Sequence, residues 1–281
     1  MKQKFSLLIM AFALTVFFSC KDTKPATLEN GHVHNKEHEV HQNYTKDTKP
    51  DCNEVHWSHH KGNEGPENWK NLCDGFSDCG GTVQSPVNIS TQDVVVNEAL
   101  SPIQFKYTQS PVEIINNGHT VQFNVSGDNK VNIADKEYNL LQFHYHTKSE
   151  HTINGDYFPM EVHFVHRFSD TDYAVIGVLF EEGAQNKLLS KYLDKFPEKN
   201  GKFDSEDTID LMHLLPSNKS YYSYKGSLTT PPCSEVVNWY VMKTPMTASK
   251  EQLDQFSKIL NSNYRPIQAL NNRKVQLYNT K

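Results

Sequence analysis

The 281-residue sequence has neither a strong excess of one charge nor an apolar run long enough for a transmembrane helix. Its formal net charge of −5 and its pI of about 6.3 give no general attraction to nucleic acid. The apolar run at residues 7–18 is shorter than the ~20 apolar residues that a membrane-spanning helix needs. The sequence also lacks an H-E-x-x-H motif, which excludes the zincin type of metalloprotease.

Residues 1–19 have the features of an export signal. Lys2 and Lys4 precede the apolar run, which ends in "FFSC" with the cysteine at position 20. Phe17 is a poor −3 residue for ordinary signal cleavage, whereas a small residue followed by cysteine resembles a bacterial lipobox. We therefore expect a signal peptide at 1–19 and a lipid anchor on Cys20, which makes the protein an exported membrane lipoprotein facing the periplasm or the cell surface. A soluble periplasmic or secreted protein is the alternative, and disulfides can persist in either setting.

Residues 20–51 are predicted to be a flexible tether that begins at the lipidated cysteine. The pentapeptide "KDTKP" occurs at 21–25 and again at 46–50, on either side of a histidine-rich stretch with few large apolar residues. Its histidines are suited to weak metal binding, and a polar linker without that role is the alternative.

Residues 52–281 have the pattern of one β-dominated domain with a few short helices. Strand-like runs occur at 103–107, 121–125, 140–146, 160–168, 173–180 and 236–242. Helical spacing is confined chiefly to 184–196 and 249–260, and Ser249 is the expected N-cap of the second helix.

The stretch "QFHYHTKSEHTING" at 142–155 places three histidines and a glutamate within eight positions. Phe143 and Tyr145 favour a strand. Side chains two positions apart on a strand share a face, so His144 and His146 are placed to bind one ion. Two exposed histidines on a sheet are the alternative.

A third ligand is offered by "MEVHFVHRF" at 160–168. On a strand, His163 shares a face with Glu161, whose carboxylate is placed to accept the ring N–H and fix the tautomer. Gln142 has the same relation to His144. No cysteine or methionine accompanies the histidines, which argues against an electron-transfer copper site.

A cupin metal site is the main rival to this interpretation. His144, His146 and Glu150 match the cupin pattern of two histidines and a glutamate. On this interpretation Glu150 is a metal ligand, and the protein is an iron or manganese oxygenase. Gly155 does not match the cupin spacing, and no clean second motif ending in histidine is present.

Six segments in order resemble the α-class carbonic anhydrases, over a region from about residue 56 to the C-terminus. They are "QSPVNI" (84–89), "NNGH" (116–119), "QFHYHTKSEH" (142–151), "MEVHFVH" (160–166), "SLTTPPCSE" (227–235) and "NYRPIQ" (263–268). The resemblance implies a single domain built on a large, mostly antiparallel twisted central sheet. It also implies a zinc lyase that reversibly hydrates carbon dioxide to bicarbonate and a proton by means of zinc-bound hydroxide.

In that family, His144, His146 and His163 would hold Zn²⁺, and Glu150 would lie outside the ligand set. Thr229 would accept the proton of the hydroxide and donate its own to Glu150. His119 matches the family's proton shuttle, and His59 and His60 are placed to share that task. Sulfonamides and small anions are inhibitors of the family.

The resemblance also assigns a substrate pocket and several structural roles. Arg265 corresponds to a buried structural arginine, His151 and His166 to hydrogen-bonded core histidines, and one X-Pro bond after Thr230 is expected to be cis. The pocket would be formed by Val165, Val175, Leu228, Thr230, Val237 and Trp239.

Two positions depart from the better-known animal pattern. Thr147 stands where animal members carry tryptophan, and His59 stands where the family often has a tyrosine.

Four cysteines remain after Cys20 is set aside. Members of the family from oxidising compartments imply one disulfide between Cys79 and Cys233, which leaves Cys52 to pair with Cys73.

Two other functions remain open on the sequence. One is a catalytically inactive binding or adhesion module on the cell surface, although inactive relatives usually lose zinc histidines that this chain retains. The other is a zinc-scavenging lipoprotein, suggested by the histidine-rich tether, which is compatible with catalysis.

Overall fold

The structure, a computed structural model, describes residues 49–280. The predicted signal peptide, the lipid anchor on Cys20 and nearly all of the tether lie outside the described residues. Among residues 49–280, no helix is both long and apolar enough to cross a membrane.

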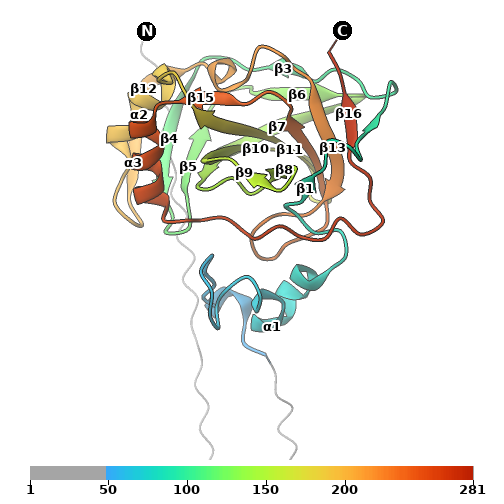
Figure 1. The fold of residues 1–281 in the computed structure, drawn as a ribbon. Helices are drawn as coiled ribbons and strands as arrows, with labels where there is room; N and C mark the ends of the chain where they lie inside the picture. Colours follow the sequence, from blue (N-terminus) through green and yellow to red (C-terminus); the bar gives the residue numbers. More distant parts are fainter. Residues whose placement is uncertain (1–48, 281) are drawn as a thin grey trace, which may run out of the picture. The chain divides into compact units, whose positions relative to one another are not determined.

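Thirteen strands form one twisted sheet that organises the described residues (Figure 1). Nine of its pairings are antiparallel, whereas β11–β14, β11–β15 and β16–β2 are parallel. The expectation of a mainly β fold on a large, mostly antiparallel sheet is therefore confirmed. In spatial order, the main path is β12 (Lys202–Ile209), β4 (Ser110–Asn116), β5 (Val121–Val125), β7 (Lys136–His146), β10 (Met160–Ser169), β11 (Asp172–Glu182), β14 (Val237–Met242), β13 (Tyr221–Gly226), β16 (Gln276–Tyr278) and β2 (Val95–Val96).

The shorter strands extend this sheet or form a small second one. β3 (Gln104–Lys106) pairs with β6 (Lys130–Ile133), which pairs with β7, and β15 (Met246–Ala248) pairs with β11. The separate three-stranded sheet contains β1 (Asn88–Ile89), β8 (Thr152–Ile153) and β9 (Asp156–Tyr157).

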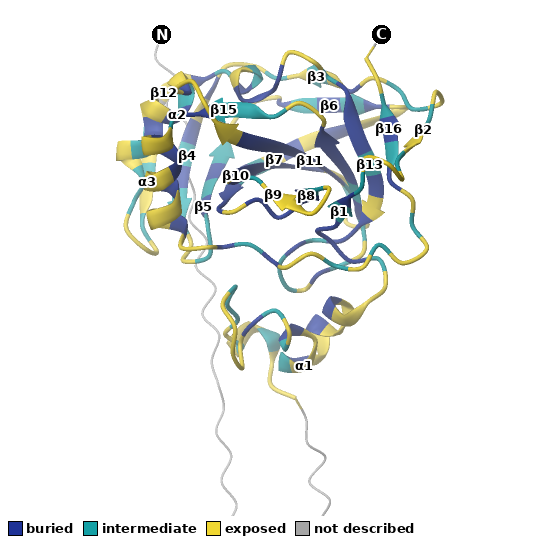
Figure 2. Cartoon of the chain, in the orientation of Figure 1, coloured by how far each residue is buried: buried dark blue, intermediate teal, exposed yellow. Residues whose placement is uncertain are grey.

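Strands β10 and β11 are buried on both faces over most of their length, which explains the continuous apolar run AVIGVLF of β11 (Figure 2). On β10, Val162 and Phe164 join the larger hydrophobic core, whereas Val165 joins a second core on the opposite face. Val175 of β11 belongs to that second core as well. Glu161 and His163, which share a face of β10 with Val165, are therefore closed off from bulk water.

A β-bulge in β7 determines which face its histidines occupy. Val165 pairs with Gln142, but the next residue, His166, pairs with Leu140, so Leu141 is an extra residue in the ladder. A bulge reverses the alternation of side chains along a strand. Consequently Leu140 and Phe143 both face the larger core despite their odd spacing, and His144 is directed to the other face.

Helices are few and short, as expected. α3 (Lys250–Leu260) begins with a capping box between Ser249 and Gln252, and it packs Leu253, Phe256 and Leu260 against the larger core. The helix expected at 184–196 is shorter, because the Asn186 side chain caps α2 (Lys187–Tyr192), which continues as the 3₁₀ turn Leu193–Lys195. The remaining elements are α1 (Trp69–Leu72) and the 3₁₀ turns Cys52–Glu54, Asp74–Gly80 and Leu211–Leu214.

Two disulfides cross-link the segment that precedes the sheet. Cys52 is bonded to Cys73, and Cys79 is bonded to Cys233 across 154 positions. Together with the fully buried Trp69 they form a small third core. The expectation of two disulfides is confirmed, and the second bridge joins this segment to the loop that follows β13.

Candidate metal centre

Three histidines from two paired strands converge on the second-core face of the sheet. His144 and His146 lie on β7, and His163 on β10 pairs directly with His144. One ring nitrogen of each lies within 4.8 Å of one ring nitrogen of the other two. The structure thus brings together the three residues that the sequence indicated as ligands.

The remaining ring nitrogens of the two β7 histidines are held by hydrogen bonds. His144 Nδ1 lies 2.8 Å from Gln142 Oε1, and His146 Nδ1 lies 2.6 Å from the backbone carbonyl of Asn263. Because both partners are acceptors, Nδ1 carries the proton and Nε2 keeps its lone pair. The Asn263 contact was missed at the sequence level, since a backbone carbonyl 117 positions away leaves no local signal.

Glu161 supports two histidines rather than one. Its Oε1 lies 2.9 Å from His163 Nε2 and 2.8 Å from His151 Nδ1, while Oε2 accepts the backbone N–H groups of Glu150 and His151. His151 Nε2 is in turn 2.6 Å from the Tyr224 hydroxyl. Although His151, Glu161 and His163 also form a compact group, their polar atoms are committed to these hydrogen bonds, so the group is suited to support.

Burial keeps all three converging imidazoles neutral. It lowers the pKa of His144 well below its ordinary value, the pKa of His146 to about 4, and that of His163 as well. His146 Nε2 is buried and has no hydrogen-bond partner among the described residues. Neutral imidazoles with fixed tautomers and free lone pairs are the donor set that suits Zn²⁺, so these residues fit such an ion.

Glu150 lies next to the histidines but belongs to a different network. Its Oε1 accepts the backbone N–H of Arg265 at 2.8 Å, and its Oε2 lies 3.8 Å from His163 Nδ1. Burial raises the pKa of Glu150, against the opposing effects of His163, the Arg265 N–H and the Thr229 side chain. Thr229 is therefore close to this carboxyl, although Oε2 has no hydrogen-bond partner of normal geometry within residues 49–280.

A cavity of about 130 Å³ adjoins the three-histidine cluster and contains His119 in its wall. The His119 ring stacks on Trp57 with 3.8 Å between ring centroids. Burial lowers its pKa, as do the charges of Lys199 and His56. His119 also lines a neighbouring cavity of about 530 Å³. The smaller cavity is lined by Trp57, His59, Asn117, His119, Thr120, Gln122, Gln142, His144, His146 and Thr230.

His59, one of the two positions that depart from the pattern described above, lines the same small cavity. Burial and then the nearby His146, His119 and His60 lower its pKa to about 3. A group with that pKa is a poor proton acceptor near pH 7.

The residues expected to form a substrate pocket fall into two groups. Thr230 lines the small cavity, whereas the other five pack in the second hydrophobic core. Trp239 lies 4.8 Å from His163, centroid to centroid, and its Nε1 donates to the Ser227 carbonyl. These five are Val165, Val175, Leu228, Val237 and Trp239.

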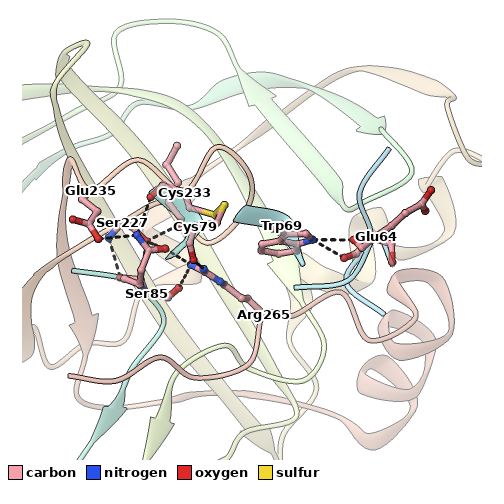
Figure 3. The surroundings of a disulfide bond; sticks show 11 residues. Glu64, Trp69, Cys79, Ser85, Ser227, Cys233, Glu235 and Arg265 are labelled. Atoms are coloured by element: carbon pink, nitrogen blue, oxygen red, sulfur yellow. Dashed lines mark hydrogen bonds between the residues drawn. A yellow bond between two sulfur atoms is a disulfide. The ribbon is translucent and has the colours of Figure 1, made fainter. Parts of the chain in front are cut away.

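The loop that carries Thr229 and Thr230 is tied down at several points. Leu228 N–H donates to the Ser234 carbonyl, and Cys233 N–H donates to that of Thr230. The Pro231–Pro232 bond is cis. Figure 3 shows the disulfide from Cys233 to Cys79 beside this loop.

Comparison with known proteins identifies one family. The model of the eukaryotic-type carbonic anhydrases matches residues 64–279. A carbonic anhydrase of Pectobacterium carotovorum is 41% identical over 222 residues, which cover 78% of this chain and 89% of that protein. A carbonic anhydrase of Neisseria gonorrhoeae is 41% identical over 226 residues, which cover 79% and 88%.

Solved structures give the same result. The α-carbonic anhydrase of Thermovibrio ammonificans, in complex with the inhibitor sulfanilamide, is 42% identical with a TM-score of 0.76, covering 79% of this chain and 99% of that one. Dioscorin complexed with ascorbate is 32% identical with a TM-score of 0.74, covering 80% and 99%.

Proposed function

This chain belongs to the α-class carbonic anhydrase family, and from that premise we propose that it hydrates carbon dioxide reversibly with Zn²⁺ held by His144, His146 and His163. The convergence of three buried imidazoles with fixed tautomers is the observation that carries this proposal. Bound there, Zn²⁺ would lower the pKa of water and so supply hydroxide at neutral pH, as in carbonic anhydrases generally.

The neighbouring residues fix the orientation of the ligands. Gln142, the Asn263 carbonyl and Glu161 each accept one imidazole N–H, so each ring presents its other nitrogen to the ion. An ionised Glu161 also increases the basicity of His163, because a negative acceptor draws the N–H proton toward itself.

Thr229 and Glu150 would select the nucleophile. A carboxylate can only accept, so the single hydroxyl proton of Thr229 would be committed to Glu150. Thr229 Oγ1 would then act only as an acceptor, which favours a bound group that carries a proton.

His119 would take up the proton released in each cycle. It lies in the wall of both cavities, so its ring links the small one to the larger one. The apolar surface of Val165, Val175, Leu228, Val237 and Trp239, with Thr230 at its polar edge, would receive carbon dioxide.

Inhibition and location follow from the same comparison. The sulfanilamide complex of the Thermovibrio ammonificans enzyme supports binding of sulfonamides at this site. The two disulfides support export to an oxidising compartment. We propose that signal peptide 1–19 directs this export and that a lipid on Cys20 anchors the protein to a membrane. Residues 20–51 would form the tether and residues 52–281 the catalytic domain.

Stopped-flow hydration of carbon dioxide combined with metal analysis tests the proposal. His144→Ala is expected to lower zinc content and abolish hydration, whereas His213→Ala, which alters an exposed histidine, leaves both unchanged. Full zinc content and activity in His144→Ala would contradict the ligand assignment.

Glu150→Gln separates this centre from the cupin-like one. It is expected to keep zinc and lose much of the activity, because the amide can donate a proton to Thr229. Loss of zinc in this variant would instead make Glu150 a ligand.

The second candidate function is that of a catalytically inactive binding module. Dioscorin, with ascorbate bound, shows that a protein of this fold has been solved with a ligand other than a sulfonamide. The retained histidines, Glu150 and Thr229 favour catalysis, and the hydration assay decides between the two.

A further inference from the structure

Gln122 lies in the wall of the small cavity at the three-histidine cluster. It is on β5, directly opposite His144 of β7 in the ladder. The cavity volume of about 130 Å³ has room for only a few water molecules, so an occupant lies close to this side chain. The polarity that the occupant meets therefore depends on which way the amide of Gln122 is turned.

The amide of Gln122 belongs to a chain of hydrogen bonds that ends at an ion pair. Gln122 Nε2 donates to Asn124 Oδ1 at 2.7 Å, and Asn124 Nδ2 donates to Glu113 Oε2 at 2.6 Å. The other carboxylate oxygen of Glu113 pairs with the ammonium group of Lys202. Glu113 lies opposite Asn124 on β4, and Lys202 is on β12, so the chain crosses three adjacent strands (Figure 1).

The carboxylate at the end gives this chain its direction. An ionised carboxylate only accepts hydrogen bonds, so Asn124 turns its NH₂ group toward Glu113 and its oxygen toward Gln122. Gln122 in turn directs its NH₂ group toward Asn124. The hydrogen bonds from Lys202 and Asn124 lower the pKa of Glu113, which keeps it ionised at neutral pH. The direction of both amides thus follows from the chemistry of Glu113.

This direction leaves the oxygen of Gln122 without a partner. Among residues 49–280, no group donates to Gln122 Oε1, and this atom is not one of the buried polar atoms that lack a partner. It is therefore accessible to a water-sized molecule. The NH₂ side of the amide is turned toward Asn124, which is not part of the cavity wall. The acceptor is the side that is left for an occupant of the cavity.

We propose that Glu113 is a positioning residue that acts through Asn124 to turn Gln122 Oε1 toward the small cavity, where it favours bound groups that carry a proton over anions that carry none. The proposal rests on the proposed function, because it concerns the groups that bind beside His144 and His146. A carbonyl oxygen attracts a hydrogen-bond donor and repels an anion. An amide turned the other way would offer an N–H donor instead and strengthen anion binding.

Exchanging the two charges tests the proposal, since it reverses the chain without removing the ion pair. In Glu113→Lys with Lys202→Glu, the ammonium group at position 113 only donates, so Asn124 turns its oxygen toward it and its NH₂ group toward Gln122. Gln122 then accepts with Oε1 and leaves its NH₂ group to the cavity. Asp204, which lies opposite position 113 in the ladder, also favours a positive charge there.

Adding Asn124→Asp to this double variant is expected to restore the original direction. A carboxylate at position 124 accepts from the ammonium group at position 113 and from Gln122 Nε2, so the Gln122 oxygen faces the cavity again. Lys250→Asp with Asp254→Lys exchanges an exposed ion pair on α3. It is the matched control and should change neither the amide nor the binding of anions.

Nuclear magnetic resonance of the ¹⁵N-labelled, metal-free protein reports the direction of the amide. The NH₂ signals of Gln122 are assigned by their loss in Gln122→Met. In the wild type one NH₂ proton is hydrogen bonded to Asn124, so the two proton shifts should be well separated. The separation should shrink in the double variant and return in the triple variant. This measurement needs neither zinc nor activity, so it stays valid if the proposed function fails.

Azide, an anion without a proton, is the probe for the cavity. Its binding is followed in the visible spectrum of the protein loaded with Co²⁺ in place of Zn²⁺. The double variant is expected to bind azide about fivefold more tightly than the wild type, the effect of about one hydrogen bond. The triple variant should return to the wild-type affinity. Failure to bind Co²⁺ would count against the proposed function, and the amide signals would still test the role of Glu113.

Three outcomes would overturn the proposal. The first is a pair of Gln122 NH₂ signals that is the same in the wild type and the double variant. The second is a reversed amide with unchanged azide affinity. The third is a triple variant that behaves like the double variant. If the double variant does not fold, Asn124→Leu interrupts the chain and preserves the ion pair, and unchanged Gln122 signals in that variant would overturn the proposal as well.

Discussion

Replacing Glu161 by glutamine is expected to weaken both the fold and the metal centre, because four donors converge on this one carboxylate. Its Oε1 serves the rings of His151 and His163, and its Oε2 serves the backbone N–H groups of Glu150 and His151. Glutamine offers one acceptor oxygen and introduces an NH₂ group. Whichever way the amide lies, two buried donors lose their acceptor and face another donor.

The size of the effect follows from that count. Each buried donor left unsatisfied costs about 1–3 kcal/mol, so the free energy of unfolding should fall by about 2–6 kcal/mol. Loss of the partner that orients a metal-binding histidine typically lowers metal affinity by about 10–100-fold. The second effect is expected when the amide NH₂ faces the rings, because His163 then loses the acceptor that fixes its tautomer.

Two measurements separate these effects. Urea denaturation of the metal-free protein at pH 7, followed by circular dichroism, gives the free energy of unfolding. Competition with a chelator gives the zinc affinity. Glu137→Gln is the matched control, since this carboxylate pairs with Lys106 and Lys130 at the surface and should change stability by less than about 1 kcal/mol.

Each possible failure has a distinct meaning. Unchanged stability would show that the donors around Glu161 find other acceptors, which refutes the count of unsatisfied groups. Reduced stability with unchanged zinc affinity would show that Glu161 supports the fold without positioning His163.

Three further predictions concern proton transfer, the long disulfide and the anchor. His119→Ala should lower maximal turnover about tenfold in dilute buffer, about 1.4 kcal/mol of barrier, with kcat/KM nearly unchanged and rescue by imidazole; unaffected turnover would place the shuttle elsewhere. Replacing both Cys79 and Cys233 by serine should lower the free energy of unfolding in urea by about 3–5 kcal/mol, given the long loop that the bridge closes, and a loss below 1 kcal/mol would contradict this. A palmitate analogue should label the wild type in cells but not Cys20→Ala, and an unlabelled wild type would indicate a soluble exported protein.

Five strands at the centre of the sheet and the short β3 were readable from the sequence, whereas β4, β13 and the end strand β12 were not. β5, β7, β10, β11 and β14 have dense apolar and β-branched residues because they are buried on one or both faces. β12 has the polar sequence "KFDSEDTI" and lies at the end of the sheet. An edge strand needs only one partner and tolerates polar residues, so its pattern carries little information.

The spacing of the histidines was enough to indicate a metal centre. A side chain two positions from its neighbour on a strand shares its face, which places His144 with His146 and Glu161 with His163 by local geometry alone. The identity of the ion and of the reaction required the resemblance over six segments, since a cupin pattern fits the same residues.

Only the tertiary structure decided which way the β7 side chains face and which groups contact the histidines of the site. The extra residue Leu141 reverses the alternation of β7, and a bulge of that kind depends on the register with β10. The acceptor for His146 is the carbonyl of Asn263, and the environment of His59 depends on residues that lie far away in the chain. Local sequence sets which face a side chain takes relative to its neighbours, but burial, hydrogen-bond partners and pKa depend on which distant segments pack there, and no short-range pattern contains that information.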